Sequence, residues 1–165
     1  MSNLLLRIEH SGLAEWIRST DSIFGYYGLL TMHAIGMGIV VGISAGFDLR
    51  ILGFARGLPL AAMEKFLPYL WIGFAINAIS GTLLLATDAT HKLVNPDFYV
   101  KMVCIALGLG ALQLLTRDLV RAPAVDTVER STKTKVIAAV SLACWLGAIV
   151  AGRLLAYVGA GGDVR

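Results

Sequence analysis

A bundle of four membrane-spanning α-helices is the fold that the sequence predicts, and three observations support it. The chain of 165 residues is 57% hydrophobic and 15% charged, whereas a soluble domain carries about a quarter charged residues. Four apolar runs approach or exceed the roughly 20 residues that a helix needs to cross a bilayer. Most of the basic residues gather in two of the connections between these runs. We therefore expect an all-α integral membrane protein with an up-down order of helices.

The first 22 residues differ from the rest of the chain. Apolar residues alternate there with charged ones, which predicts an amphipathic helical segment that lies on the membrane surface; the apolar residues are Leu5, Ile8, Leu13, Trp16 and Ile17. At the other end, the glycine-rich residues 159–165 are expected to form a flexible tail.

The four spanning helices are expected within residues 23–158, at about 23–47, 66–88, 97–116 and 135–158. Asn95 can cap the third helix, and Pro96 suits its first turn. The basic connections lie between the first two helices and between the last two. Because basic loops stay in the cytoplasm, we expect both termini on the periplasmic side of a bacterial inner membrane. Basic residues in these positions indicate contact with membrane lipids and not nucleic-acid binding.

His33 lies inside an uncharged run that extends from residue 22 to residue 47. An ionisable side chain in such a run is costly to bury, so it indicates a function by default. On a helix, Gly38, Gly42 and Gly46 form a stripe roughly opposite His33. Such stripes let a second helix approach closely in lipid. The first helix is therefore expected to be central, or to contact a second copy of the chain.

Several polar residues are predicted to lie in the same half of the membrane as His33. Lys101 and Arg153 are somewhat shallower, and Asp88 and His91 lie at the membrane surface. The second helix carries Asn77 on a polar face, which must contact protein, a cofactor or water. The sequence thus gathers imidazole, amine, guanidinium and carboxylate groups at one end of the bundle.

This set of residues predicts a b-type haem, because membrane cytochromes use imidazole as an axial ligand. His33 would ligate the metal, and Gly36 would leave room for the macrocycle. Lys101 and Arg153 would pair with the propionates, and Asn77 or Tyr26 would support the imidazole. The second ligand stays open: His91 on a tilted haem, a methionine, His33 of a second copy, or none. The candidate methionines are Met32, Met37 and Met102.

Other interpretations of the same residues stay open. His33 could be a neutral imidazole that serves only packing, and Lys101 and Arg153 could extend to lipid headgroups. Asp48 and Arg50 are expected to form a pair at the membrane boundary. The sequence has no GxSxG, HExxH or phosphate-loop motif, so no catalytic residue is assigned.

An ordered set of short motifs runs through nearly the whole chain. It comprises His33, DLRILG at 48–53, GTLL at 81–84, NPDFYVK at 95–101 and GRLLAY at 152–157. In this set the chain resembles an uncharacterised family of bacterial four-helix inner-membrane proteins, whose architecture is similar to small b-type membrane cytochromes. The resemblance implies the fold and brings no activity with it. The several intramembrane histidines of two-haem cytochromes are absent from this sequence, so we expect at most one haem per chain.

The leading prediction is a membrane electron-transfer subunit that holds one haem b through His33. It would work as a homo-oligomer or within a larger membrane complex, and would exchange electrons with a redox partner or quinone. Two alternatives stay open. One is a cofactor-free scaffold or accessory subunit, and the other is a quinone- or proton-handling protein in which His33 titrates.

Overall fold

The computed structural model describes residues 2–20, 25–54, 57, 59–121 and 131–160, and every regular element among them is a helix. Four stretches are long and apolar enough to cross a membrane, namely Tyr26–Leu52, Ala62–Ala86, Pro96–Arg117 and Thr132–Leu155. The predicted all-α bundle of four spanning helices is therefore confirmed, and the chain is a multi-pass membrane protein. The predicted tail at 159–165 lies largely outside the described residues.

The N-terminal segment forms two short helices where the sequence predicts one, α1 (Ser2–Glu9) and α2 (Gly12–Ser19). Ser11 separates them, because its hydroxyl accepts a hydrogen bond from Ala14 N at 3.4 Å and caps α2. Ala14 and Ile17 are buried, whereas Leu13 and Trp16 are exposed. One face of α2 thus packs on the protein while apolar side chains remain on the outside, as an interfacial helix requires.

The spanning helices are α3 (Tyr26–Leu52), α5 (Leu67–Ala86), α7 (Pro96–Arg121) and α8 (Thr132–Ala160), and α4 (Leu60–Glu64) and α6 (Ala89–Lys92) are short connections. Helix α3 continues past residue 47, where the sequence predicts its end, because Asp48 is buried and does not mark a boundary. Gly53 ends it with a φ of 100°, and its N–H donates to Leu49 O and Arg50 O.

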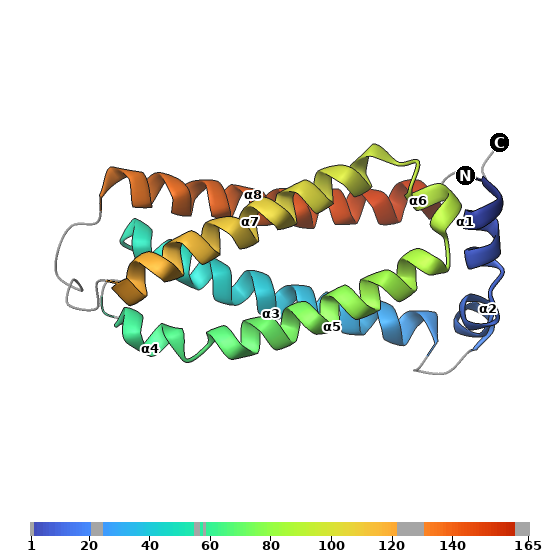
Figure 1. The fold of residues 1–165 in the computed structure, drawn as a ribbon, viewed down its shortest axis with the longest axis horizontal. Coiled ribbons are helices and arrows are strands. Elements are labelled where there is room, and N and C mark those ends of the chain that lie inside the picture. Colours follow the sequence, from blue (N-terminus) through green and yellow to red (C-terminus); the bar gives the residue numbers. More distant parts are fainter. Residues whose placement is uncertain (1, 21–24, 55–56, 58, 122–130, 161–165) are drawn as a thin grey trace.

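The bundle consists of two antiparallel pairs (Figure 1). Helix α3 packs along α5, and α7 packs along α8; contact between α3 and α8 joins the two pairs. Helices α5 and α7 make little direct contact. The short helices α1, α2 and α6 lie at one end of the bundle and α4 at the other. We call these the α6 end and the α4 end.

Glycines allow α3 and α5 to cross closely. A Cβ atom on Gly36 would lie 2.8 Å from both Asn77 N and Gly73 O, and a Cβ on Gly73 would lie 2.7 Å from the Ile39 side chain. The two backbones therefore touch at Gly36 and Gly73. Gly38 and Gly42 face away, since a Cβ there would meet nothing within 4 Å.

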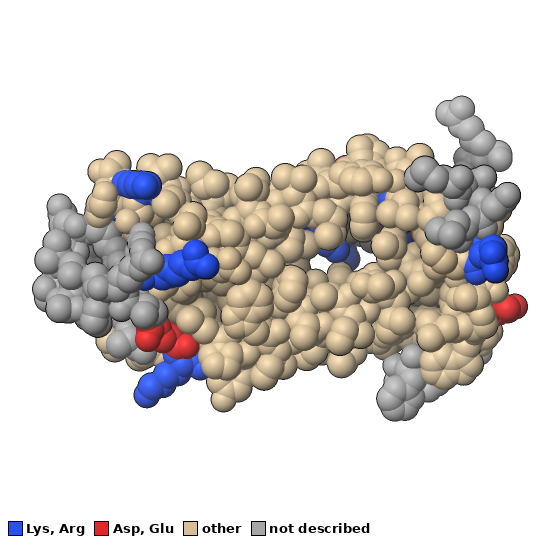
Figure 2. Space-filling view, in the orientation of Figure 1, with Lys and Arg blue, Asp and Glu red and all other residues tan. Residues whose placement is uncertain are grey.

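Apolar clusters fill the half of the bundle nearest α4. One cluster is Phe47, Leu70 and Leu112, and another is Ile51, Leu115 and Ala138. Figure 2 shows charged side chains at both ends of the visible face and an almost uncharged middle. The exception is a hollow between α5 and the α7/α8 pair, in which Lys or Arg atoms are visible.

Candidate functional site

The imidazole of His33 is fixed against α5. Its Nδ1 lies 3.0 Å from Asn77 O and 3.2 Å from Ser80 Oγ. The Ser80 hydroxyl donates its hydrogen to Ile76 O at 2.6 Å. Because a backbone carbonyl only accepts, the short contact to Asn77 O assigns the ring proton to Nδ1. This tautomer leaves the lone pair on Nε2.

Two features of α5 make this position possible. Asn77 Nδ2 donates to the backbone carbonyl of His33 at 2.8 Å, which ties the helices together at the depth of the imidazole. A Cβ atom on Gly81 would lie 2.8 Å from His33 Cε1, so only glycine leaves room for the ring there. The polar face of α5 that the sequence predicts thus serves to hold His33.

Lys101 approaches the other side of the imidazole from α7. Its Nζ lies 3.2 Å from His33 Nε2, and the Nδ1-protonated tautomer makes the amine the donor. The stem of Lys101 passes Gly152 of α8, where a Cβ would lie 3.6 Å from both Cδ and Cε. Residues from all four spanning helices therefore position this pair, which we call the His33–Lys101 pair.

The charge of the pair follows from its geometry. Protonating both bases would place two positive charges 3.2 Å apart in an apolar region, which is strongly unfavourable. The pair therefore holds at most one excess proton, which either base can carry. A site of this kind can donate a proton to a bound oxygen atom or accept one from it.

Tyr26 and His91 lie at other places in the fold than the imidazole. Tyr26 begins α3, and its ring contacts that of Tyr27 at a centroid distance of 6.0 Å. Arg153 is exposed on α8. His91 lies on α6, with 80% of its side chain exposed, and its Nδ1 is 2.8 Å from Asp88 Oδ1.

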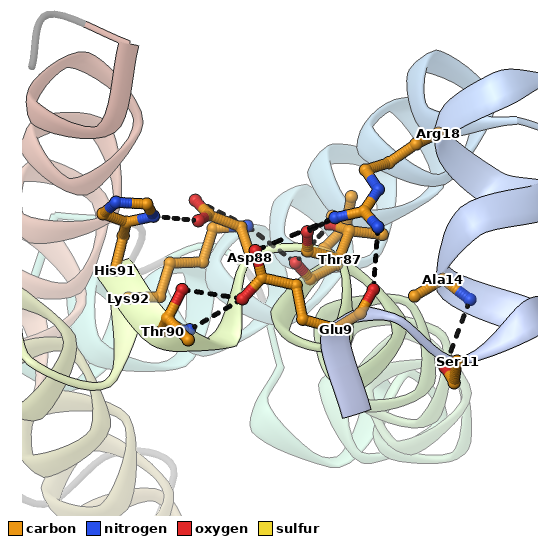
Figure 3. A network of polar contacts seen from close by, with 10 residues as sticks. Glu9, Ser11, Ala14, Arg18, Thr87, Asp88, Thr90, His91 and Lys92 are labelled. Atoms are coloured by element: carbon orange, nitrogen blue, oxygen red, sulfur yellow. Dashed lines mark hydrogen bonds and ion pairs between the residues drawn. The ribbon is translucent and has the colours of Figure 1, made fainter. Parts of the chain in front are cut away.

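A polar network at the α6 end joins the N-terminal helices to α6 (Figure 3). Glu9 Oε2 accepts hydrogen bonds from Thr90 Oγ1 at 2.7 Å and from Thr90 N at 3.3 Å. Arg18 donates to Thr87 O at 3.0 Å and to Glu9 O at 2.7 Å. The Thr90 hydroxyl hydrogen bond is the main reason that the pKa of Glu9 falls below its ordinary value of 4.5.

Lys92 belongs to the same network. Its Nζ donates to Leu84 O at 2.6 Å and lies 4.0 Å from Asp88 Oδ2. Burial lowers the pKa of Lys92, and the carboxylates of Asp88 and Glu9 oppose that shift. This network anchors the amphipathic segment and does not include His33.

With Lys101 in this position, the Nε2 atom of His33 is not open to a haem iron. The amine of Lys101 occupies the position next to Nε2 that an iron would take. Gly36, which the sequence predicts to clear space for a macrocycle, instead faces the α5 backbone. Among the methionines considered as a second ligand, Met32 and Met102 are about half exposed. Within the described ranges, no group of three or more His, Cys, Asp or Glu side chains could hold a metal ion.

Sequence reasoning did not identify the roles of Ser80 and Gly81 beside the imidazole, although their spacing from Asn77 placed them on its face. It also did not predict the burial of Asp48.

Comparisons with protein-family models, with curated proteins and with solved structures each find no match. The family resemblance of the sequence therefore stays a prediction.

Proposed function

We propose that the protein binds a membrane quinone or quinol at the His33–Lys101 pair and exchanges a proton with it. The observation that carries the proposal is the 3.2 Å contact between Lys101 Nζ and His33 Nε2, inside the spanning part of the bundle. The hollow between α5 and the α7/α8 pair (Figure 2) supports a lateral route for a lipid-soluble ligand.

The chemistry of the pair is complementary to both forms of such a ligand. A quinone carbonyl oxygen accepts a hydrogen bond from the Lys101 amine, whereas a quinol hydroxyl donates one to the lone pair of His33 Nε2. Oxidation of a quinol releases two protons and two electrons. The pair accepts one proton at a time, and the electrons pass to a separate redox protein. This need for a partner agrees with a role as a subunit of a membrane complex.

Haem binding remains a second candidate because of one contact. The hydrogen bond from His33 Nδ1 to a backbone carbonyl is the arrangement that orients ligating imidazoles in metal sites. A haem at Nε2 would require Lys101 to turn away from its present position.

The proposed location is a bacterial inner membrane with both termini in the periplasm, as the basic connections favour.

The test uses the full chain purified in mild detergent. Lipid-soluble molecules are extracted and analysed for quinone, a short-chain quinol is titrated, and visible spectra are recorded in oxidised and reduced states. We expect bound quinone and saturable quinol binding. His33→Ala and Lys101→Met should weaken binding about tenfold or more, since each removes a hydrogen bond of about 1.5–3 kcal/mol to a charged or polar partner.

Lys65→Met is the matched control, because Lys65 is an exposed lysine near the α4 end. It should bind quinol as the unchanged protein does. A Soret band that His33→Ala abolishes would replace the quinone proposal with haem ligation. A colourless, folded protein that binds no quinol would overturn both and leave a scaffold role.

A further inference from the structure

Three buried oxygen-bearing side chains without partners lie in the half of the bundle nearest α4. Asp48 and Ser44 of α3 and Ser141 of α8 are each 0% exposed. Both carboxylate oxygens and both hydroxyl oxygens lack a hydrogen-bond partner among the described residues. Buried polar atoms are nearly always paired, so three unpaired side chains together need an explanation.

These three side chains lie close together between α3 and α8. Ser44 precedes Asp48 by one helical turn and therefore lies on the same face of α3. Ile51 of α3 and Ala138 of α8 belong to one apolar cluster, and Asp48 and Ser141 each lie one turn nearer the α6 end. The Ser141 hydroxyl therefore faces the Asp48 carboxyl. The expected boundary pair of Asp48 with Arg50 places the carboxylate at the membrane surface, whereas the structure places it inside the bundle.

The surroundings make an isolated negative charge costly. Phe47 and Ile51 flank Asp48 on α3, and Ala138 lies one turn before Ser141 on α8; all three belong to the apolar clusters. An ionised carboxylate without a counter-charge is strongly disfavoured in such a region. A bound cation would supply that charge and would use all three side chains at once.

We propose that Asp48, Ser44 and Ser141 bind one alkali-metal cation, with sodium as the probe. Carboxylate and hydroxyl oxygens are the hard donors that such ions take. One carboxylate neutralises one monovalent charge, whereas a divalent ion would leave a positive charge in an apolar region. The site lies on different residues from the His33–Lys101 pair, so it does not depend on the proposed quinone chemistry.

The experiment compares the full chain in detergent with sodium chloride and with choline chloride at equal ionic strength. Sodium at ten times its dissociation constant should raise the Tm by about 3–6 °C. Radioactive sodium should bind one ion per chain. Asp48→Asn should abolish both effects, and Ser141→Ala should raise the sodium concentration needed about tenfold.

Asp88→Asn is the control, because it removes a carboxylate at the opposite end that already contacts His91. This variant should keep the sodium effect. Absence of bound sodium in the unchanged protein would overturn the proposal, and so would sodium binding that survives Asp48→Asn. If Asp48→Asn does not fold, the concentration shift in Ser141→Ala decides. An infrared band of a protonated carboxylic acid that Asp48→Asn removes, and that sodium leaves unchanged, would assign a proton to the site instead.

Discussion

Lys101 of α7 lies 3.2 Å from His33 of α3, so this contact joins one antiparallel helix pair to the other. Asn77 O of α5 places the ring proton on Nδ1, and Nε2 accepts from an amine that comes from the opposite helix pair. The position of each residue along its predicted helix places both in one half of the membrane, but only the fold shows that they touch.

The tautomer of His33 is a direct test of this contact. We expect nitrogen NMR of labelled protein in lipid to show Nδ1 protonated and Nε2 hydrogen-bonded at neutral pH, because Asn77 O can only accept. Lys101→Met should change the Nε2 signal and leave Nδ1 largely unchanged. Lys65→Met should change neither. A proton on Nε2 in the unchanged protein would contradict the arrangement.

Substitution of Gly36 tests the close crossing of α3 and α5. Gly36→Ala should lower the free energy of unfolding by about 1–3 kcal/mol, because its Cβ would lie 2.8 Å from two α5 backbone atoms that cannot move independently. Thermal unfolding in detergent measures the change. Gly42→Ala is the control, since nothing lies within 4 Å of a Cβ there. Equal losses in the two variants would contradict the predicted crossing.

Asn77 is expected to stabilise the bundle through its bond to the His33 carbonyl. Asn77→Leu should cost about 0.6–1.7 kcal/mol, which spans the average and the largest measured energies of hydrogen bonds between membrane helices. Thr82→Val is the matched control, because Thr82 is exposed on α5 and bonds only its own helix at Ala78 O. Unfolding of both variants in the same detergent gives the comparison. A loss no larger than that of Thr82→Val would show that Asn77 does not tie the helices.

The attachment of α1 and α2 should depend on pH through Glu9. The pKa of Glu9 in the folded protein is below its ordinary value of 4.5, so its carboxylate stabilises attachment fully above that pH. The contribution is lost as the pH falls below 4.5 and through the lowered pKa. We expect hydrogen exchange in α1 to rise over that range. Thr90→Val should move the rise to higher pH, since it removes the 2.7 Å bond. A profile that Thr90→Val leaves unmoved would exclude Glu9 as the cause.

The sequence predicts the fold class well, because the length and apolarity of a spanning helix are local properties. Its prediction for Gly36 shows where local reasoning stops. A glycine one turn from a histidine leaves space on its own helix, but whether a cofactor or a neighbouring backbone fills that space depends on how the helices cross. The same limit applies to Asp48. A carboxylate near the end of an apolar run is expected at the surface, and only the continuation of α3 to Leu52 places it inside.

The N-terminal segment illustrates a second limit. Amphipathic spacing predicts a surface helix. The contacts of Glu9 with Thr90 of α6 and of Arg18 with Thr87 at the end of α5 depend on partners 81 and 69 residues away in the chain. Composition cannot specify such a partner.

The weak contact between α5 and α7 has a mechanical consequence. Because α3 and α8 make the main contact between the two helix pairs, a rotation about that contact would separate α5 from α7. The His33–Lys101 contact joins α3 of one pair to α7 of the other. A molecule that inserts between Nε2 and Nζ would have to break that hydrogen bond. Occupancy of the site and the angle between the two helix pairs would therefore be coupled.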